Sequence, residues 1–254
     1  MKHYKIGGST AARTINCPAW IGATENIPKQ PASTYADAGT LCHNAMEEHY
    51  VNGTAFSELV EKEFSYNKHT LTEDIVEALL VPAKKAVELV KDTFGIDEFI
   101  CEPFVELIPE LVGGSIDMLG RGTDTLLILD YKFGASRVHV ADNQQLQFYA
   151  ACVRQDPSTA HWFDGITEIA YVIVQPKANK EPDVWTSSVH ELDVFEIALH
   201  MAILETSSDK PTFKQGYHCH YCPITATCAE KNKQKLKDAK NLMSKLVDSP
   251  SLFN

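Results

Sequence analysis

The stretch Gly114–Gly134, GSIDMLGRGTDTLLILDYKFG, carries two aspartates and a lysine in segments that are otherwise strongly apolar. These two segments have the composition of β-strands, and the residues between them favour a turn, so we expect a β-hairpin. Asp117 lies on the first strand, while Asp130 and Lys132 end the second. The expected turn contains Gly120, Gly122 and Asp124.

The expected hairpin brings its charged side chains together. Residues two apart on a strand share a face, so Asp130 and Lys132 project on one side and Tyr131 on the other, with Asp117 alongside Asp130. Two converging carboxylates repel each other unless a cation lies between them, and oxygen ligands suit Mg²⁺ or Mn²⁺. A divalent metal beside a lysine is suited to hydrolysing phosphodiesters. Taken singly, the same residues also suit a turn cap or exposed charges at a strand end.

The composition favours a soluble, intracellular globular protein. The chain has 254 residues, of which 44% are hydrophobic and 22% are charged, enough for a substantial core. No apolar run approaches the roughly 20 residues of a membrane-spanning helix, and the first residues lack the apolar middle of a secretory signal. The net charge of −11 disfavours general attraction to nucleic acid, so a DNA substrate would need a local basic groove and bound metal.

Hydrophobic periodicity predicts a single α/β domain over residues 1–254. We expect a helix over 36–49 capped by Thr40, and a second helix over 71–94 that Pro82 bends. Strands follow over 98–112 and in the hairpin, then a helix over 143–154, a strand over 169–176 and a helix over 189–206. The domain divides into an irregular arm with Cys17 (1–35), a catalytic core (36–200), a cysteine region (201–230) and a basic tail (231–254).

Asp117 followed by Asp130-x-Lys132 resembles the signature of the PD-(D/E)XK nuclease superfamily, and most closely its RecB-like exonucleases. That resemblance implies a restriction-endonuclease-like core with a central mixed sheet flanked by helices. RecB-like enzymes carry a histidine on a helix before the sheet and a Gln-x-x-x-Tyr motif on the helix after the catalytic strand. The implied metal ligands are His43, Asp117, Asp130 and the Tyr131 carbonyl; the other implied catalytic residues are Lys132, Gln145 and Tyr149.

Each of these matches has a plainer structural interpretation. His43 also suits a hydrogen-bonded core histidine, and Tyr149 a packing aromatic. Glu47, one helical turn after His43, and Glu106 are weaker candidates for an additional acidic ligand.

Cys219, Cys222 and Cys228 form a C-x2-C-x5-C cluster suited to metal ligation. Cys17 is the expected fourth ligand, because Cys-Pro recurs at both places. The arrangement is similar to the iron-sulfur staple of some RecB-like nucleases, including AddB-type subunits and CRISPR-associated exonucleases, which implies a [4Fe-4S] cluster that joins the chain ends. The alternative is Zn²⁺ with His218 or His220 replacing a thiolate. The other cysteines, Cys42, Cys101 and Cys152, fit apolar core patterns.

The resemblance implies a Mg²⁺- or Mn²⁺-dependent DNA exonuclease acting in recombination, repair or end processing on single-stranded DNA or free ends. The early motifs at Ser9–Arg13, Asn16–Pro18 and Gly39–His43 resemble phage-encoded members, which implies the cytoplasm of a bacterial host. One alternative is a DNA-binding protein that does not cut; another is a subunit active only with a helicase, annealing or recombination partner. The lysine-rich tail suits either a solvated helix face or contact with DNA phosphates.

Overall fold

The computed structural model describes residues 4–28 and 34–247, and the chain divides into two compact units. The first unit comprises Met1–Ala11 and Gln30–Ile197, and the second comprises Ala12–Lys29 and Ala198–Asn254. Both units therefore combine segments that are far apart in the sequence. The predicted single domain with four regions is not tested by this division and stays a prediction.

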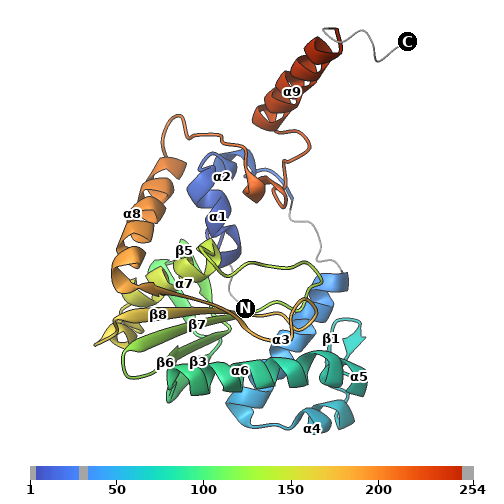
Figure 1. Ribbon diagram of the computed structural model, residues 1–254, viewed down its shortest axis with the longest axis vertical. Coiled ribbons are helices and arrows are strands. Elements are labelled where there is room, and N and C mark those ends of the chain that lie inside the picture. The colour runs from blue at the N-terminus through green and yellow to red at the C-terminus, as the bar shows by residue number, and fades with distance from the viewer. Residues whose placement is uncertain (1–3, 29–33, 248–254) are drawn as a thin grey trace. The chain divides into compact units, whose positions relative to one another are not determined.

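A five-stranded mixed sheet forms the centre of the first unit (Figure 1). Its order is β3-β6-β7-β8-β9, in which only the β7-β8 pair is parallel. The predicted α/β class with a central mixed sheet flanked by helices is confirmed. The strands are β3 (Glu98–Cys101), β6 (Met118–Arg121), β7 (Thr125–Tyr131), β8 (Glu168–Val174) and β9 (Asp183–Ser188), the last of which the sequence pattern did not reveal.

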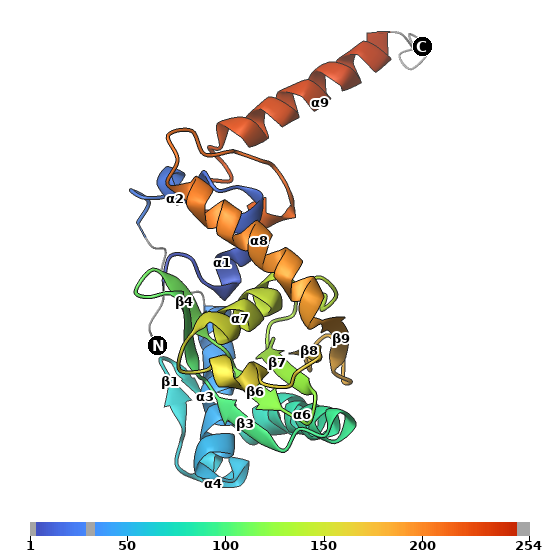
Figure 2. The same ribbon diagram turned by 90° about the vertical axis from the view of Figure 1, so that its left-hand side faces the viewer.

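Helices cover the two faces of this sheet (Figure 2). On one face, Leu127, Leu129 and Tyr131 pack into a core with residues of α3 (Thr34–Asn52) and α6 (Val81–Phe94). Because side chains alternate along β7, Asp130 points to the opposite face, where α7 (Gln144–Gln155) packs. The predicted division between Tyr131 and its two charged neighbours is thus confirmed.

The helix predictions need two corrections of detail. Thr40 does not cap α3, since it lies inside the helix and its hydroxyl donates to the Ala36 carbonyl. The helix predicted over 71–94 is helical from Glu73 to Phe94, but it consists of α5 (Glu73–Ile75), a π-helical segment (Val76–Leu80) and α6. Pro82 lies in the first turn of α6, where its missing N–H does least harm; the wider π turn comes directly before it.

The predicted first strand of the hairpin is interrupted. Asp117 lies between β5 (Val112–Ser115) and β6, which belong to different sheets, since β5 pairs with β4 (Phe104–Ile108). Gly120 is within β6, so the turn is limited to residues 122–124. Short elements complete the unit: α4 (Phe56–Glu61), β1 (Ser65–Tyr66), β2 (His69–Thr70) and the 3₁₀ turn Ala160–Phe163.

The predicted irregular arm is wrong, because it contains α1 (Gly8–Asn16) and α2 (Trp20–Ala23). These short helices depend on tertiary contacts: Trp20 is buried and donates from its indole to Thr14, and the Ala19 N–H donates to the Thr212 carbonyl. The sequence of α1 and α2 lacks a long hydrophobic period because only a few residues of these short helices are buried against the rest of the protein. Most of the IPKQP segment lies outside the described residues.

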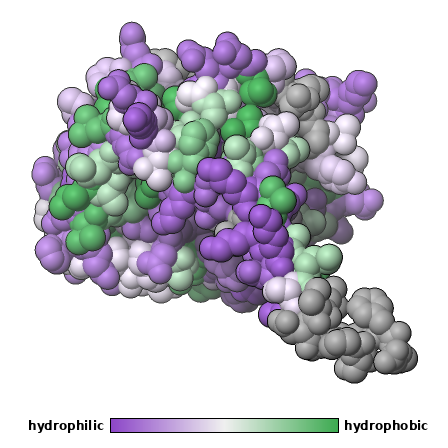
Figure 3. All heavy atoms as spheres, turned by 90° about the horizontal axis from the view of Figure 1, so that it is seen from above, coloured by the Kyte–Doolittle hydropathy of each residue, from purple (hydrophilic) through white to green (hydrophobic). Residues whose placement is uncertain are grey.

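The second unit also contains the end of α8 (Val189–Thr206), the 3₁₀ turn Tyr217–Cys219 and α9 (Ala229–Val247). Most of α9 is exposed, and its lysines give a largely hydrophilic surface in which Leu236, Leu242 and Met243 are interspersed (Figure 3). Contact of this helix with DNA stays a prediction. Within the ranges that the structure describes, no helix combines the length and apolarity needed to cross a membrane.

Candidate functional site

Three acidic residues form a row at one end of three neighbouring strands. Cys101 of β3 pairs with Met118 of β6, which pairs with Leu129 of β7. Next to this row lie three acidic residues: Glu102 and Asp130, which follow Cys101 and Leu129, and Asp117, which precedes Met118. The Glu102 N–H donates to the Asp117 carbonyl at 3.1 Å, which continues the ladder by one bond. The strand register therefore brings together carboxylates that are separated by up to 28 positions.

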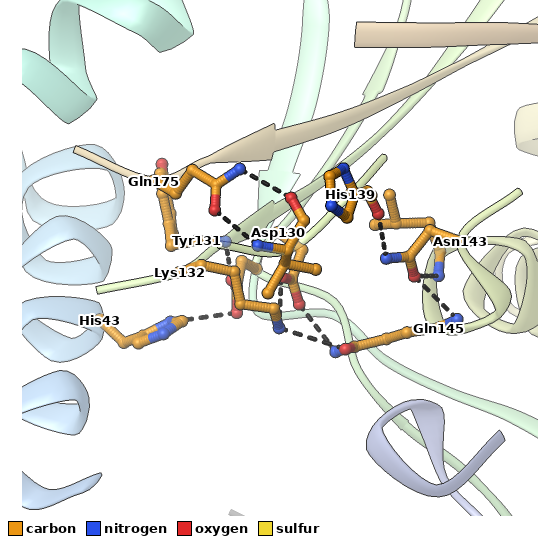
Figure 4. Close-up of polar contacts among 11 residues, drawn as sticks. His43, Asp130, Tyr131, Lys132, His139, Asn143, Gln145 and Gln175 are labelled. Carbon is orange, nitrogen blue, oxygen red and sulfur yellow. Dashed lines mark hydrogen bonds and ion pairs between the residues drawn. The ribbon is translucent and has the colours of Figure 1, made fainter. Parts of the chain in front are cut away.

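Lys132 and Gln145 hold the carboxylate of Asp130 (Figure 4). The Lys132 Nζ lies 2.5 Å from Asp130 Oδ2, and the Gln145 amide donates to Asp130 Oδ1 at 2.8 Å. Lys132 also donates to Gln145 Oε1 at 3.2 Å, so the three side chains form a closed network. Asn143 caps the helix that carries Gln145 by accepting from the N–H groups of Gln145 and Leu146.

His43, Glu102 and Asp117 form a second group, whose potential ligand atoms lie within 4.8 Å of one another. The His43 Nδ1 lies 3.2 Å from Asp117 Oδ1, and the Tyr131 N–H donates to Asp117 Oδ2 at 2.5 Å. An imidazole and two carboxylates at this spacing can share one divalent cation.

The pKa shifts in this second group indicate that Glu102 and Asp117 oppose each other's ionisation. Burial, followed by the neighbouring Asp117, raises the pKa of Glu102 to about 8. Burial opposes ionisation of Asp117 as well, but His43 and Lys132 outweigh it and lower the pKa of Asp117. Burial lowers and Asp117 raises the pKa of His43, with a net increase. A cation between the carboxyls would offset both the burial and the repulsion by Asp117 that raise the pKa of Glu102.

One cleft contains both groups, and its cavity has a volume of about 260 Å³. Tyr149 lines it, four residues after Gln145 on the same face of α7. Gly8 and Ser9, at the start of α1, line it as well. Gly8 lies so close to Tyr149 that an added Cβ would fall 2.4 Å from the ring carbon Cζ.

The structure separates some of the predicted ligands from others. Asp130 is outside the group of His43, Glu102 and Asp117, and its carboxylate faces Lys132 and Gln145 instead. Glu47 and Glu106 are also outside that group. Glu106 accepts a hydrogen bond from the Glu110 N–H near the β4-β5 turn. The predicted role of the Tyr131 carbonyl stays a prediction.

Sequence reasoning missed Glu102. Its backbone φ is +52°, a left-handed conformation that is unusual for glutamate, and Pro103 follows it. Such strained positions are concentrated at functional sites, and here the strain turns the chain at the end of β3. An acidic residue between a short strand and a proline was the available signal.

The four predicted cysteine ligands line one pocket in the second unit. Cys17 is buried; Cys219, Cys222 and Cys228 are half-buried, and all are free thiols. Burial raises the pKa of Cys17, and each of the other three raises it further, which shows that they lie near it. Among described residues no three of these sulfurs lie within 4.8 Å of one another. His218 lines the pocket too, whereas Cys42 and Cys152 are buried in the first unit, as predicted.

Comparison with known proteins identifies a family. Solved structures similar to this chain include the alkaline exonuclease LHK-Exo from Laribacter hongkongensis, with 13% identity over 91% of this chain and 97% of that chain and a TM-score of 0.32. The structure of LHK-Exo in complex with dAMP has 12% sequence identity to this chain, over 91% of this chain and 96% of that chain, with a TM-score of 0.32. A phage-related exonuclease from Haemophilus somnus 129PT has 13% sequence identity, over 81% of this chain and 94% of that chain, with a TM-score of 0.30. No curated protein matches the sequence. A family described as a protein of unknown function, DUF2800, matches residues 3–251, and the chain therefore belongs to the DUF2800 family.

Proposed function

We propose that the chain is a Mg²⁺- or Mn²⁺-dependent deoxyribonuclease that acts as an exonuclease on DNA with free ends. The observation that carries this proposal is the meeting of two groups in one cleft, the Lys132–Asp130 ion pair and the His43–Glu102–Asp117 cluster. Phosphodiester hydrolysis needs both parts: acidic ligands for a metal and a nearby cation beside the reacting phosphate.

The donor set fits a hard divalent cation. His43, Glu102 and Asp117 would hold it, with Asp130 and the Tyr131 carbonyl as the further ligands that the resemblance implies. The bound metal would supply an activated water and a positive charge that offsets the charge on phosphate. The raised pKa of Glu102 supports the fit, because the protein leaves a carboxyl poorly compensated where a cation would lie.

The chain's own residues orient the reactants. Lys132 is held by Asp130 and Gln145, so its Nζ is fixed at the cleft, where it would donate to the attacking water or to phosphate. Tyr149 would form part of the wall along which the DNA strand lies. The setting we propose is recombination, repair or end processing, together with a helicase or annealing protein.

The cysteine pocket would hold a second centre, a [4Fe-4S] cluster, with Zn²⁺ as the alternative. The four cysteines line one cavity, as either centre requires. A single zinc ion with bonds of about 2.3 Å draws thiolates to within about 4 Å of each other. The preference for the iron-sulfur cluster rests on the resemblance of the cysteine spacing to the iron-sulfur staple. Its role would be to join α1 to the C-terminal segment.

The test is digestion of end-labelled single- and double-stranded DNA by anaerobically purified protein, with Mn²⁺ or with a chelator. We expect metal-dependent release of nucleotides from ends, and loss of this release in Asp130→Ala. Lys62→Ala is the control, since Lys62 forms an exposed ion pair with Glu58 of α4. DNA binding without metal-dependent cleavage by the unmodified protein would instead identify a binding protein, and undiminished cleavage by Asp130→Ala would remove Asp130 from the mechanism.

A further inference from the structure

Arg13 is a buried cation in the pocket that the four cysteines line. It belongs to α1, has only 9% of its surface exposed, and shares the cavity with Cys17 and the three C-terminal cysteines. The guanidinium of arginine stays charged at all ordinary pH values, and burial of a charge is costly unless an opposite charge or hydrogen bonds compensate it. The position of Arg13 therefore calls for a compensating group.

The protein supplies only part of that compensation. One terminal nitrogen of Arg13 donates to the Tyr221 carbonyl at 2.7 Å, and the guanidinium carbon lies 4.8 Å from the centre of the Trp20 ring. The Nε–H is buried and has no hydrogen-bond partner among the described residues. None of the ion pairs between described residues includes Arg13. Glu230, the acidic residue that lines the pocket, pairs with Lys233 instead.

The contacts of Arg13 connect the two segments that carry the cysteines. The Cys17 N–H donates to the Arg13 carbonyl at 2.8 Å, so Cys17 follows Arg13 by one helical turn. Tyr221, which accepts the hydrogen bond from the side chain, lies between Cys219 and Cys222 in the C-x2-C loop. Arg13 thus connects the turn that carries Cys17 to that loop.

We infer that Arg13 is the counter-cation of the metal centre bound by the cysteines, with its Nε–H donating to that centre. This inference rests on the cysteine site of the proposed function. A zinc ion or an iron-sulfur cluster held by four thiolates is an anion, and it supplies the charge and the acceptor that Arg13 lacks. Arginine suits this position better than lysine, because its planar group can stack on Trp20, reach Tyr221 and still present Nε–H to the centre.

The test compares the full-length wild-type chain with Arg13→Met, Arg13→Lys and the control Lys240→Met, an exposed cation of the same unit. Each protein is loaded with Fe²⁺ and sulfide or, separately, with Zn²⁺, and the bound metal and its rate of release to a chelator are measured. We expect Arg13→Met to release the metal about tenfold to a hundredfold faster, Arg13→Lys to recover part of this loss, and the control to match the wild type. For an iron cluster, Arg13→Met should also have a more negative reduction potential, because reduction then adds charge to a less compensated anion.

The outcomes separate this inference from the proposal of the site. If the wild type binds neither metal, or if Cys222→Ser binds it equally well, the cysteine site itself is wrong. If the wild type binds metal and Arg13→Met keeps its release rate and its potential, the site stands and the role of Arg13 is overturned. If Arg13→Met does not fold by circular dichroism, Arg13→Lys and Arg13→Gln decide. Slower metal release from Arg13→Lys than from Arg13→Gln, with Arg13→Gln faster than wild type, supports a charge role. Equal behaviour of Arg13→Gln and wild type refutes it.

Discussion

The carboxylate cleft and the cysteine pocket both gather ionisable side chains from distant parts of the sequence, but they hold them differently. In the cleft, the residues hold one another, since Lys132 and Gln145 bind Asp130, and His43 binds Asp117. In the pocket, the four thiols are free, and burial together with the other three cysteines raises the pKa of Cys17. The comparison indicates that hydrogen bonds and ion pairs of the protein organise the cleft, whereas the proposed metal centre would be needed to hold the thiols of the pocket together.

The largest effect is expected at Lys132. Lys132→Ala should lower metal-dependent DNA cleavage roughly a thousandfold, because a fixed donor at the reacting phosphate is lost. The melting temperature should fall as well, because the buried carboxylate of Asp130 loses its cation. Cleavage rates and melting curves check this, with Lys62→Ala as the matched lysine-carboxylate pair. Wild-type cleavage in Lys132→Ala would contradict the proposed role.

Metal removal probes the comparison directly. A chelator that strips only Mg²⁺ or Mn²⁺ should leave the melting temperature unchanged, because hydrogen bonds already order the cleft. Cys222→Ser should lower the melting temperature by roughly 10 °C, which corresponds to about 3 kcal/mol for a chain of this size. Calorimetry of both samples is the measurement. An unchanged melting temperature in Cys222→Ser would show that the pocket holds together without a bound centre.

Glu102 tests whether the strained acidic residue belongs to the metal site. Glu102→Gln should raise the Mn²⁺ concentration needed for half-maximal cleavage by about tenfold to a hundredfold, because one charged ligand is lost. Glu98→Gln is the control, because Glu98 is exposed and lies in β3, the strand that Glu102 directly follows. The Mn²⁺ dependence of cleavage distinguishes them, and identical curves would exclude Glu102 as a ligand.

Gly8 tests how tightly the start of α1 closes the cleft. Gly8→Ala should destabilise the protein by about 1–3 kcal/mol, because the new methyl group overlaps the ring of Tyr149. The second change Tyr149→Ala should recover part of that loss if the overlap is its cause. Gly39→Ala serves as the control, since no atom lies within 4 Å of a Cβ there. Denaturant unfolding measures all three.

Asp156 gives the smallest effect and samples hydrogen bonds outside both sites. Its carboxylate accepts from the N–H and hydroxyl of Ser158 and from the Glu106 N–H. Burial raises the pKa of Asp156, but these bonds outweigh it and lower the pKa. Asp156→Ala should cost about 1–2 kcal/mol at neutral pH. Because a lowered pKa stabilises the fold above the unfolded value near 4, the difference from wild type should shrink as pH falls below about 4. A difference that grows on acidification would be the contrary result.

Local pattern was sufficient for much of the first unit. The alternation in TLLILDYK predicts that Asp130 and Lys132 share a face and that Tyr131 enters the core, since this depends only on the two-residue period of a strand. The same holds for α7, where Asn143 and the helical spacing place Gln145 and Tyr149 one turn apart. The C-x2-C-x5-C spacing likewise identifies the thiol cluster before any fold is known.

Tertiary structure decided what depends on contacts between distant segments and on single backbone angles. The position of Asp117 between two sheets, the entry of Glu102 beside it through a left-handed turn, and the burial of Arg13 beside the cysteines follow from no periodicity in their own neighbourhoods. The short helices α1 and α2 are stable only against partners some 200 residues away. The sequence by itself therefore determined which side chains face together within one element, and the fold determined which elements meet, because register and packing are properties of the whole chain.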